Sequence, residues 1–181
     1  MKSKQIRNFV LAAMFLALGL VLPFLTGQIP AIGQMLSPMH LPVMLCGFIC
    51  GPGYGAAVGF ICPLLRGMMF NMPVIFPNGI AMAFELCTYG LVTGAVYKAL
   101  KKMKRLPRIY VTLIIAMIAG RIVWGLVRFV LSLLFANAGF SFQMFLMSGF
   151  VNAWPAFILQ FVLIPLVLEI LYGAKLIKDE D

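Results

Sequence analysis

Charged residues are scarce in this chain of 181 amino acids. Only 10% of the residues are charged and 63% are hydrophobic, and the mean hydropathy is +1.05. A soluble domain of this size needs more polar surface than these residues can supply. The composition therefore excludes a soluble protein and indicates a protein that is embedded in lipid.

Residues for catalysis are also few. The chain has one histidine, His40, and no histidine or carboxylate accompanies the spacing of Cys46 and Cys50, which could otherwise suggest a metal site. A membrane-embedded enzyme needs a nucleophile with a base, or a metal cluster such as HExxH. A GxxxxGK[ST] loop for ATP is missing too. We therefore expect a non-catalytic protein with no metal site and no cofactor, and cysteines that are small buried hydrophobes.

No linker or low-complexity segment divides residues 1–181, so we expect one domain.

The net charge of +9 comes mainly from three basic patches. Lysine and arginine gather at the cytoplasmic flanks of membrane helices, so the patches indicate a membrane topology and not nucleic-acid binding. They are Lys2, Lys4 and Arg7; Lys98, Lys101, Lys102, Lys104, Arg105 and Arg108; and Lys175 and Lys178.

The spacing of these patches predicts the number of membrane spans. If all patches lie inside, the number of spans between neighbours is even. The 90 residues between Arg7 and Lys98 fit four helices of ~20 residues, and the 66 between Arg108 and Lys175 fit two. The sequence predicts an all-α integral membrane protein with six transmembrane helices and with both termini cytoplasmic. The spans are 8–26 (a membrane helix rather than a cleaved signal peptide), a short one at 40–51, 55–70, 79–98, 109–136 and 146–173.

Four ionisable residues fall well inside these spans, where a charge needs a cavity or a partner. They are Arg66, Glu85, Arg121 and Arg128, and three of them lie in the outer half. Helical periodicity places further polar and aromatic residues on the same stripes. The stripes are Asn78, Met82, Glu85 and Tyr89; Arg121, Trp124 and Arg128; and Ser148 and Asn152 beside Trp154.

The stripes predict a solute cavity that opens to the outside. The alternative is a structural ion pair of Glu85 with Arg121 or Arg128 that only fixes helix packing. His40 is expected at the membrane interface, and Glu169 is expected to reach lipid headgroups or Lys175. Pairs of small residues four positions apart predict close helix contacts; these are Ala13 and Ala17, Gly55 and Gly59, and Gly90 and Gly94.

Together these features resemble the substrate-specific (S) component of energy-coupling factor (ECF) vitamin transporters. The first helix contains LAAMFLALGL, and the middle of the chain reads LPVMLCGFICGPGYGAAVGFICPLLRG followed by MAFELCTYGLVTGAVYK. The resemblance implies that Ala13 and Ala17 dock onto a transmembrane coupling subunit. It also implies two ABC-type ATPases as partners, a vitamin-like solute captured from outside, release by toppling of the subunit, and a bacterial plasma membrane.

Three arginines against one glutamate favour a solute with an anionic group. Within the family, pantothenate fits this better than a queuosine precursor, which would use Glu85. A stand-alone secondary carrier or channel stays open as an alternative. The candidate substrate-binding residues are Arg66, Glu85, Arg128, Asn152, Trp154, Arg121, Trp124, Asn78 and Tyr89.

Overall fold

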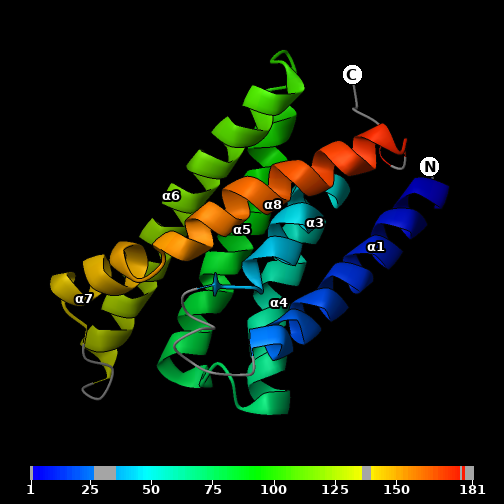
Figure 1. Cartoon of the computed structure of the whole chain (residues 1–181). Helices are drawn as coiled ribbons and strands as arrows, with labels where there is room; N and C mark the ends of the chain where they lie inside the picture. The colour runs from blue at the N-terminus through cyan, green and yellow to red at the C-terminus, as the bar shows by residue number, and fades with distance from the viewer. Residues whose placement is uncertain (1, 27–35, 136–139, 176, 178–181) are drawn as a thin grey trace.

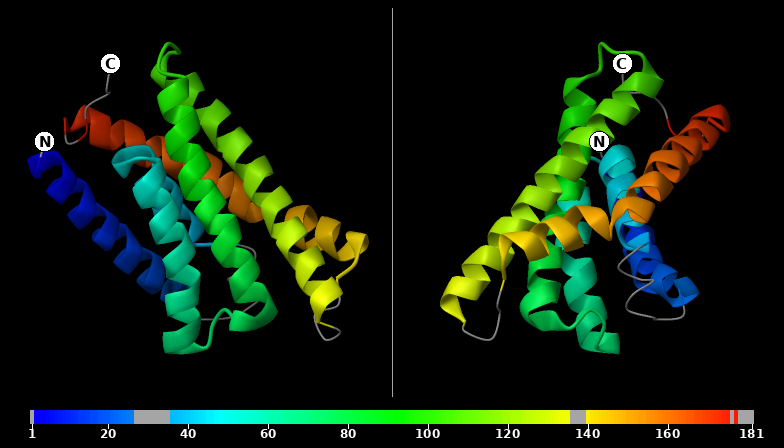
Figure 2. Two further views of the ribbon diagram at one scale, coloured as in Figure 1. Left: turned by 180° about the vertical axis from the view of Figure 1, so that it is seen from behind. Right: turned by 60° about the vertical axis from the view of Figure 1, so that its left-hand side comes forward.

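The computed structural model describes residues 2–26, 36–135, 140–175 and 177, and every regular element among them is a helix. The helices are α1 Lys2–Val21, η1 Leu22–Thr26, α3 His40–Cys50, α4 Pro52–Phe70, η2 Ile75–Gly79, α5 Ile80–Ala99, α6 Arg105–Leu134, α7 Phe142–Leu146, η4 Met147–Val151 and α8 Trp154–Gly173. Helix α1 lies at one edge of the bundle and α6 at the other, and α8 crosses the bundle obliquely (Figures 1 and 2).

Among the described residues, five helical stretches are long and apolar enough to cross a membrane. They are Lys4–Leu25, Pro52–Phe70, Ile75–Ala99, Arg105–Leu134 and Phe142–Gly173. The chain is thus an all-α integral membrane protein, as predicted. The second predicted span is the short helix α3, whose 11 residues extend roughly 16 Å at 1.5 Å per residue. It covers about half of a 30 Å hydrocarbon layer before Gly51, at φ 96°, turns the chain into α4.

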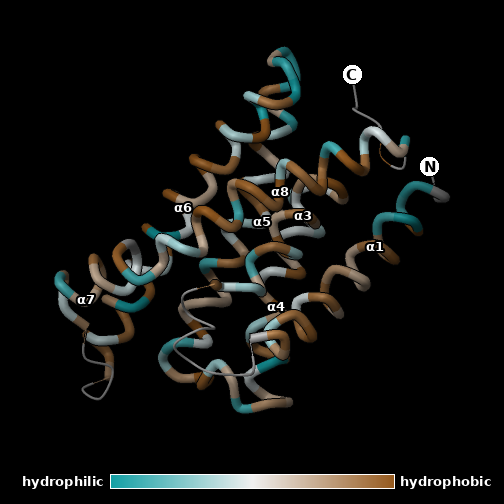
Figure 3. Tube along the Cα trace, in the orientation of Figure 1, coloured by the Kyte–Doolittle hydropathy of each residue, from teal (hydrophilic) through white to brown (hydrophobic). Residues whose placement is uncertain are grey.

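The described residues of the three basic patches, which do not include Lys178, lie toward one end of the molecule (Figure 1). The start of α1, the connection between α5 and α6 and the end of α8 are all found there (Figure 1). The hydropathy colouring shows hydrophilic residues at the start of α1 and in the α5–α6 connection (Figure 3). We call this end of the molecule, which also holds the end of α8, the basic end. This arrangement is what an even number of crossings between patches requires. That the basic end is cytoplasmic stays a prediction.

Helices α4 and α5 pack closely through the small residues that the sequence indicated. A Cβ atom on Gly55 would lie 2.6 Å from the carbonyl oxygen of Gly90, closer than real Cβ atoms come. Gly59 meets the backbone of Leu86 in the same way, and Gly94 meets Pro52. The prediction of close contacts at these two glycine pairs is confirmed.

The expectation that Glu169 reaches lipid headgroups or Lys175 is wrong. Its carboxylate accepts two hydrogen bonds from Arg105, at 2.8 and 2.9 Å, and the Arg105 guanidinium also lies over the ring of Tyr172, 4.6 Å from its centroid. The planar guanidinium fits a carboxylate with two parallel bonds, which a lysine ammonium such as that of Lys175 cannot offer. The pair ties the start of α6 to the end of α8.

Candidate functional site

A cavity of about 410 Å³ lies between the helices, away from the basic end. Arg66, one turn before the end of α4, and Arg128, in the last two turns of α6, place it at the opposite end of the bundle. Its lining combines charged, polar and apolar side chains. The lining residues are Pro23, Ser37, Pro38, Met39, His40, Arg66, Met72, Pro73, Val74, Asn78, Met82, Glu85, Arg121, Trp124, Arg128, Phe140, Met144, Ser148 and Asn152.

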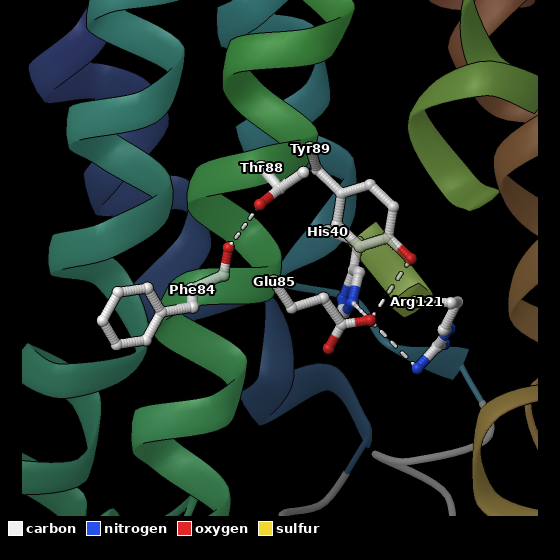
Figure 4. Close-up of polar contacts among 6 residues, drawn as sticks. All are labelled: His40, Phe84, Glu85, Thr88, Tyr89 and Arg121. Atoms are coloured by element: carbon white, nitrogen blue, oxygen red, sulfur yellow. Dashed lines mark hydrogen bonds and ion pairs between the residues drawn. The ribbon is translucent and has the colours of Figure 1, made fainter. Parts of the chain in front are cut away.

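A buried network surrounds the carboxylate of Glu85 (Figure 4). Arg121 Nη1 lies 3.0 Å from Glu85 Oε1, and the Tyr89 hydroxyl donates to the same oxygen at 3.2 Å. His40 Nε2 is 3.7 Å from it, and the His40 ring meets the edge of the Tyr89 ring at a centroid distance of 5.2 Å. Glu85 is only 1% exposed. Its charge is thus balanced by Arg121 and not by Arg128.

Arg128 differs from the other two arginines of the cavity. Its side chain is buried, and its guanidinium lies 5.4 Å from the centroid of the Phe140 ring. Within the described part of the chain, its Nε and Nη1 atoms have no hydrogen-bond partner. Buried donors normally have a partner, because leaving one unpaired is costly. Arg128 can therefore bind an acceptor that enters the cavity.

The guanidinium of Arg66 makes its contacts with other groups of the protein. It is 2% exposed, donates from Nη1 to the carbonyl of Leu20 in α1, and lies 4.9 and 5.3 Å from the ring centroids of Phe24 and Phe70. It also lines the cavity. Arg66 thus connects the cavity wall to the end of α1.

Aromatic rings form another part of the wall. Trp124 stacks on Phe145 at a centroid distance of 6.2 Å and an interplanar angle of 23°, and it meets Phe140 edge-on at 5.7 Å. Asn78 and Asn152 line the cavity with Trp124. The cavity thus offers a solute both amides and a flat apolar surface.

Seven of the nine candidate substrate-binding residues line the cavity. Tyr89 is fully buried and reaches Glu85 from within the bundle. Trp154 is 58% exposed and is not part of the lining. The expectation that His40 is interfacial is wrong, since this side chain is 3% exposed and lies against Glu85. Its position at the start of α3 gave no sign of a partner that lies 45 residues further along the chain.

The fold and the cavity define a polytopic α-helical membrane protein with an internal, mainly cationic cavity at one end. The family model of the ECF transporter, substrate-specific component, matches residues 7–168. The chain therefore belongs to this family, whose members are transport subunits and which implies partners among the membrane and ATPase components of an ECF transporter. No curated protein and no solved structure matches the chain.

Proposed function

We propose that this chain is the substrate-capture subunit of an ATP-driven ECF importer and that its solute carries an anionic group, as pantothenate does. The observation that carries the proposal is the guanidinium of Arg128, which lines the cavity and whose Nε and Nη1 atoms have no partner among the described residues. Guanidinium recognises carboxylate and phosphate groups through paired, charge-assisted hydrogen bonds. Arg128 is the anion contact, and the aromatic wall around Trp124 holds the remainder of the solute.

The state of Glu85 disfavours a cationic solute such as a queuosine precursor. Such a solute needs a free carboxylate, and Glu85 already accepts from Arg121 and Tyr89. To bind a cation there, the protein would have to separate a buried ion pair, which costs several kcal/mol. Glu85 instead holds Arg121 in the wall.

Helix α1 offers a free face for the coupling subunit. Ala12 and Phe15 are buried in the bundle, whereas Ala13 and Ala17 are exposed on the other side of the helix. Small residues on an exposed helix face let a second helix approach closely. We assign docking to this face, with two ABC-type ATPases supplying energy, in a bacterial plasma membrane with both termini cytoplasmic.

Calorimetry with pantothenate on the purified protein tests the solute assignment. Replacing Arg128 by Met removes one charge-assisted contact worth ~1.5–3 kcal/mol, so affinity should fall roughly ten- to a hundredfold. Arg105→Met, at the basic end, is the control and should bind like the wild type. Native affinity in Arg128→Met would contradict the anion site, and binding of a queuosine precursor but not pantothenate would favour Glu85 as the contact.

Uptake assays test the docking face. Ala13→Trp and Ala17→Trp should keep solute binding in detergent but lose uptake and co-purification with the coupling subunit, because a bulky ring keeps the two helices apart. Ile158→Trp is the matched control, since Ile158 is 55% exposed on α8. Uptake by the reconstituted chain without ATPases would contradict the importer model and support a stand-alone carrier.

A further inference from the structure

Arg66 satisfies a backbone group at the end of α1. The Leu20 carbonyl, in the last turn of α1, accepts a hydrogen bond from Arg66 Nη1. In the 3₁₀ pattern that follows, the donor for this carbonyl would come from Pro23, and proline has no N–H. The guanidinium of Arg66 supplies a donor there from α4.

The same guanidinium is held between two aromatic rings. Phe24 comes from η1 and Phe70 is the last residue of α4, and the two rings meet edge-on at a centroid distance of 5.0 Å. A cation over such rings is attracted by their electron-rich faces. Nearby, a Cβ atom on Gly19 would lie 2.6 Å from Cys62 Sγ, so α1 and α4 are already in close contact. Arg66 therefore joins two helix ends as well as lining the cavity.

We propose that Arg66 is a positioning residue that fastens the end of α1 to the cavity wall and makes the docking helix respond to solute. A carboxylate is a stronger acceptor for guanidinium than an amide carbonyl. Arg66 and Arg128 line the same cavity, so the anionic group that Arg128 binds also offers an acceptor to Arg66. This acceptor draws Arg66 away from Leu20, and the end of α1 loses its fastening. This inference rests on the proposed function, because α1 carries Ala13 and Ala17.

A distance measurement between two spin labels tests the fastening. Leu25 in η1 is 81% exposed and Met69 in α4 is 59% exposed, so both accept a label through an introduced cysteine once the four native cysteines are replaced. In the full-length protein without solute we expect a narrow distance distribution. Arg66→Met should broaden it in the absence of solute, and Arg66→Lys, which keeps a charged donor, should restore part of the narrow distribution.

Pantothenate tests the response. In the wild type, saturating pantothenate should broaden or shift the distribution toward that of Arg66→Met, and the Arg66→Met distribution should not respond. A purely structural role would leave the wild-type distance independent of solute. An unchanged distribution in Arg66→Met without solute overturns the fastening, and pantothenate binding without any change in distance overturns the response.

Calorimetry on the same samples separates this inference from the proposed function. If pantothenate does not bind to the wild type, the solute assignment fails, and the comparison without solute decides whether Arg66 fastens α1. Arg128→Met is the control: it should weaken binding and keep the narrow distribution. A broad distribution in Arg128→Met would show general loosening and overturn the assignment to Arg66. If Arg66→Met does not fold, Arg66→Lys carries the comparison.

Discussion

The two ends of this molecule use arginine in different ways. At the basic end, Arg108 donates to the carbonyl of Tyr97 at 2.6 Å and lies 3.7 Å from the centroid of its ring. Arg105 forms the two-bond pair with Glu169, and the hydroxyls of Tyr97 and Tyr172 are 3.0 Å apart. These contacts connect α5, α6 and α8, so the arginines of this end hold helices together.

At the cavity end, the buried arginines differ in how far their charge and their hydrogen-bond donors are matched by partners. Arg121 is paired with Glu85, although its Nε has no partner in the described part of the chain, and Arg66 is matched by a carbonyl and two rings. Among the described residues, Arg128 has neither a counter-ion nor an acceptor for its Nε and Nη1 atoms. Stability alone gives no reason to bury such a group. Among the arginines compared, the one that the proposed function makes the anion contact is thus the one whose buried guanidinium has no protein acceptor among the described residues.

The largest expected effect is at Glu85. Glu85→Leu leaves Arg121 buried without its counter-ion, and breaking such a pair typically costs 3–5 kcal/mol of unfolding free energy. Titration with SDS in mixed micelles measures this loss. The double variant Glu85→Leu with Arg121→Met should recover most of the stability, because a buried ion pair can often be replaced by apolar residues. A double variant as unstable as the single one would contradict the pairing.

The second-largest loss of stability is expected at Arg108, and it tests the comparison of the two ends directly. Arg108 is 6% exposed, and Arg108→Met removes a hydrogen bond from a charged donor, worth ~1.5–3 kcal/mol, together with its contact to the Tyr97 ring. We expect a loss of stability and unchanged solute affinity, the reverse of the result expected for Arg128→Met. Both quantities are measured on each variant by SDS titration and calorimetry. If Arg108→Met weakened solute binding as strongly as Arg128→Met, the division between the ends would not hold.

Much of the fold was predictable because lipid imposes strong constraints on sequence. The apolar runs and basic patches located the helices, although α1 begins at Lys2 and not at the expected residue 8. The short α3 begins at the expected residue 40 and ends at Cys50. The stripe of Asn78, Met82 and Glu85 lines one cavity, as a 3.6-residue period requires. Ala13 and Ala17 are exposed, and their role in docking stays a prediction.

The orientation of Trp154 and the partner of Glu85 could not be predicted, because helical periodicity does not reveal a π turn or the point where two helices cross. The π-helical turn Met147–Val151 and the turn after it precede Trp154. A π turn closes i→i+5 bonds and changes the register of the residues that follow, so Ser148 and Asn152 line the cavity while Trp154 faces outward. The choice of Arg121 over Arg128 as partner of Glu85 likewise depends on where α5 and α6 cross.

The smallest expected effect is at Arg105, and it tests whether the basic end is an aqueous boundary. The side chains of Arg105 and Glu169 are 40% and 32% exposed, so water screens the pair. Exposed ion pairs contribute about 0–1 kcal/mol, and this one should come near the upper limit because its geometry is bidentate. Arg105→Gln should therefore lower the unfolding free energy by no more than ~1 kcal/mol, and by less in 1 M salt, where the Debye length is about 3 Å.

Arg105→Lys keeps the charge but loses the second bond, and its unfolding free energy should fall between those of Arg105→Gln and the wild type. SDS titration at low and high salt measures all three proteins. A loss above ~2 kcal/mol that salt does not reduce would place Arg105 with the buried ion pairs, and the basic end would then lie within the hydrocarbon layer and not at its surface.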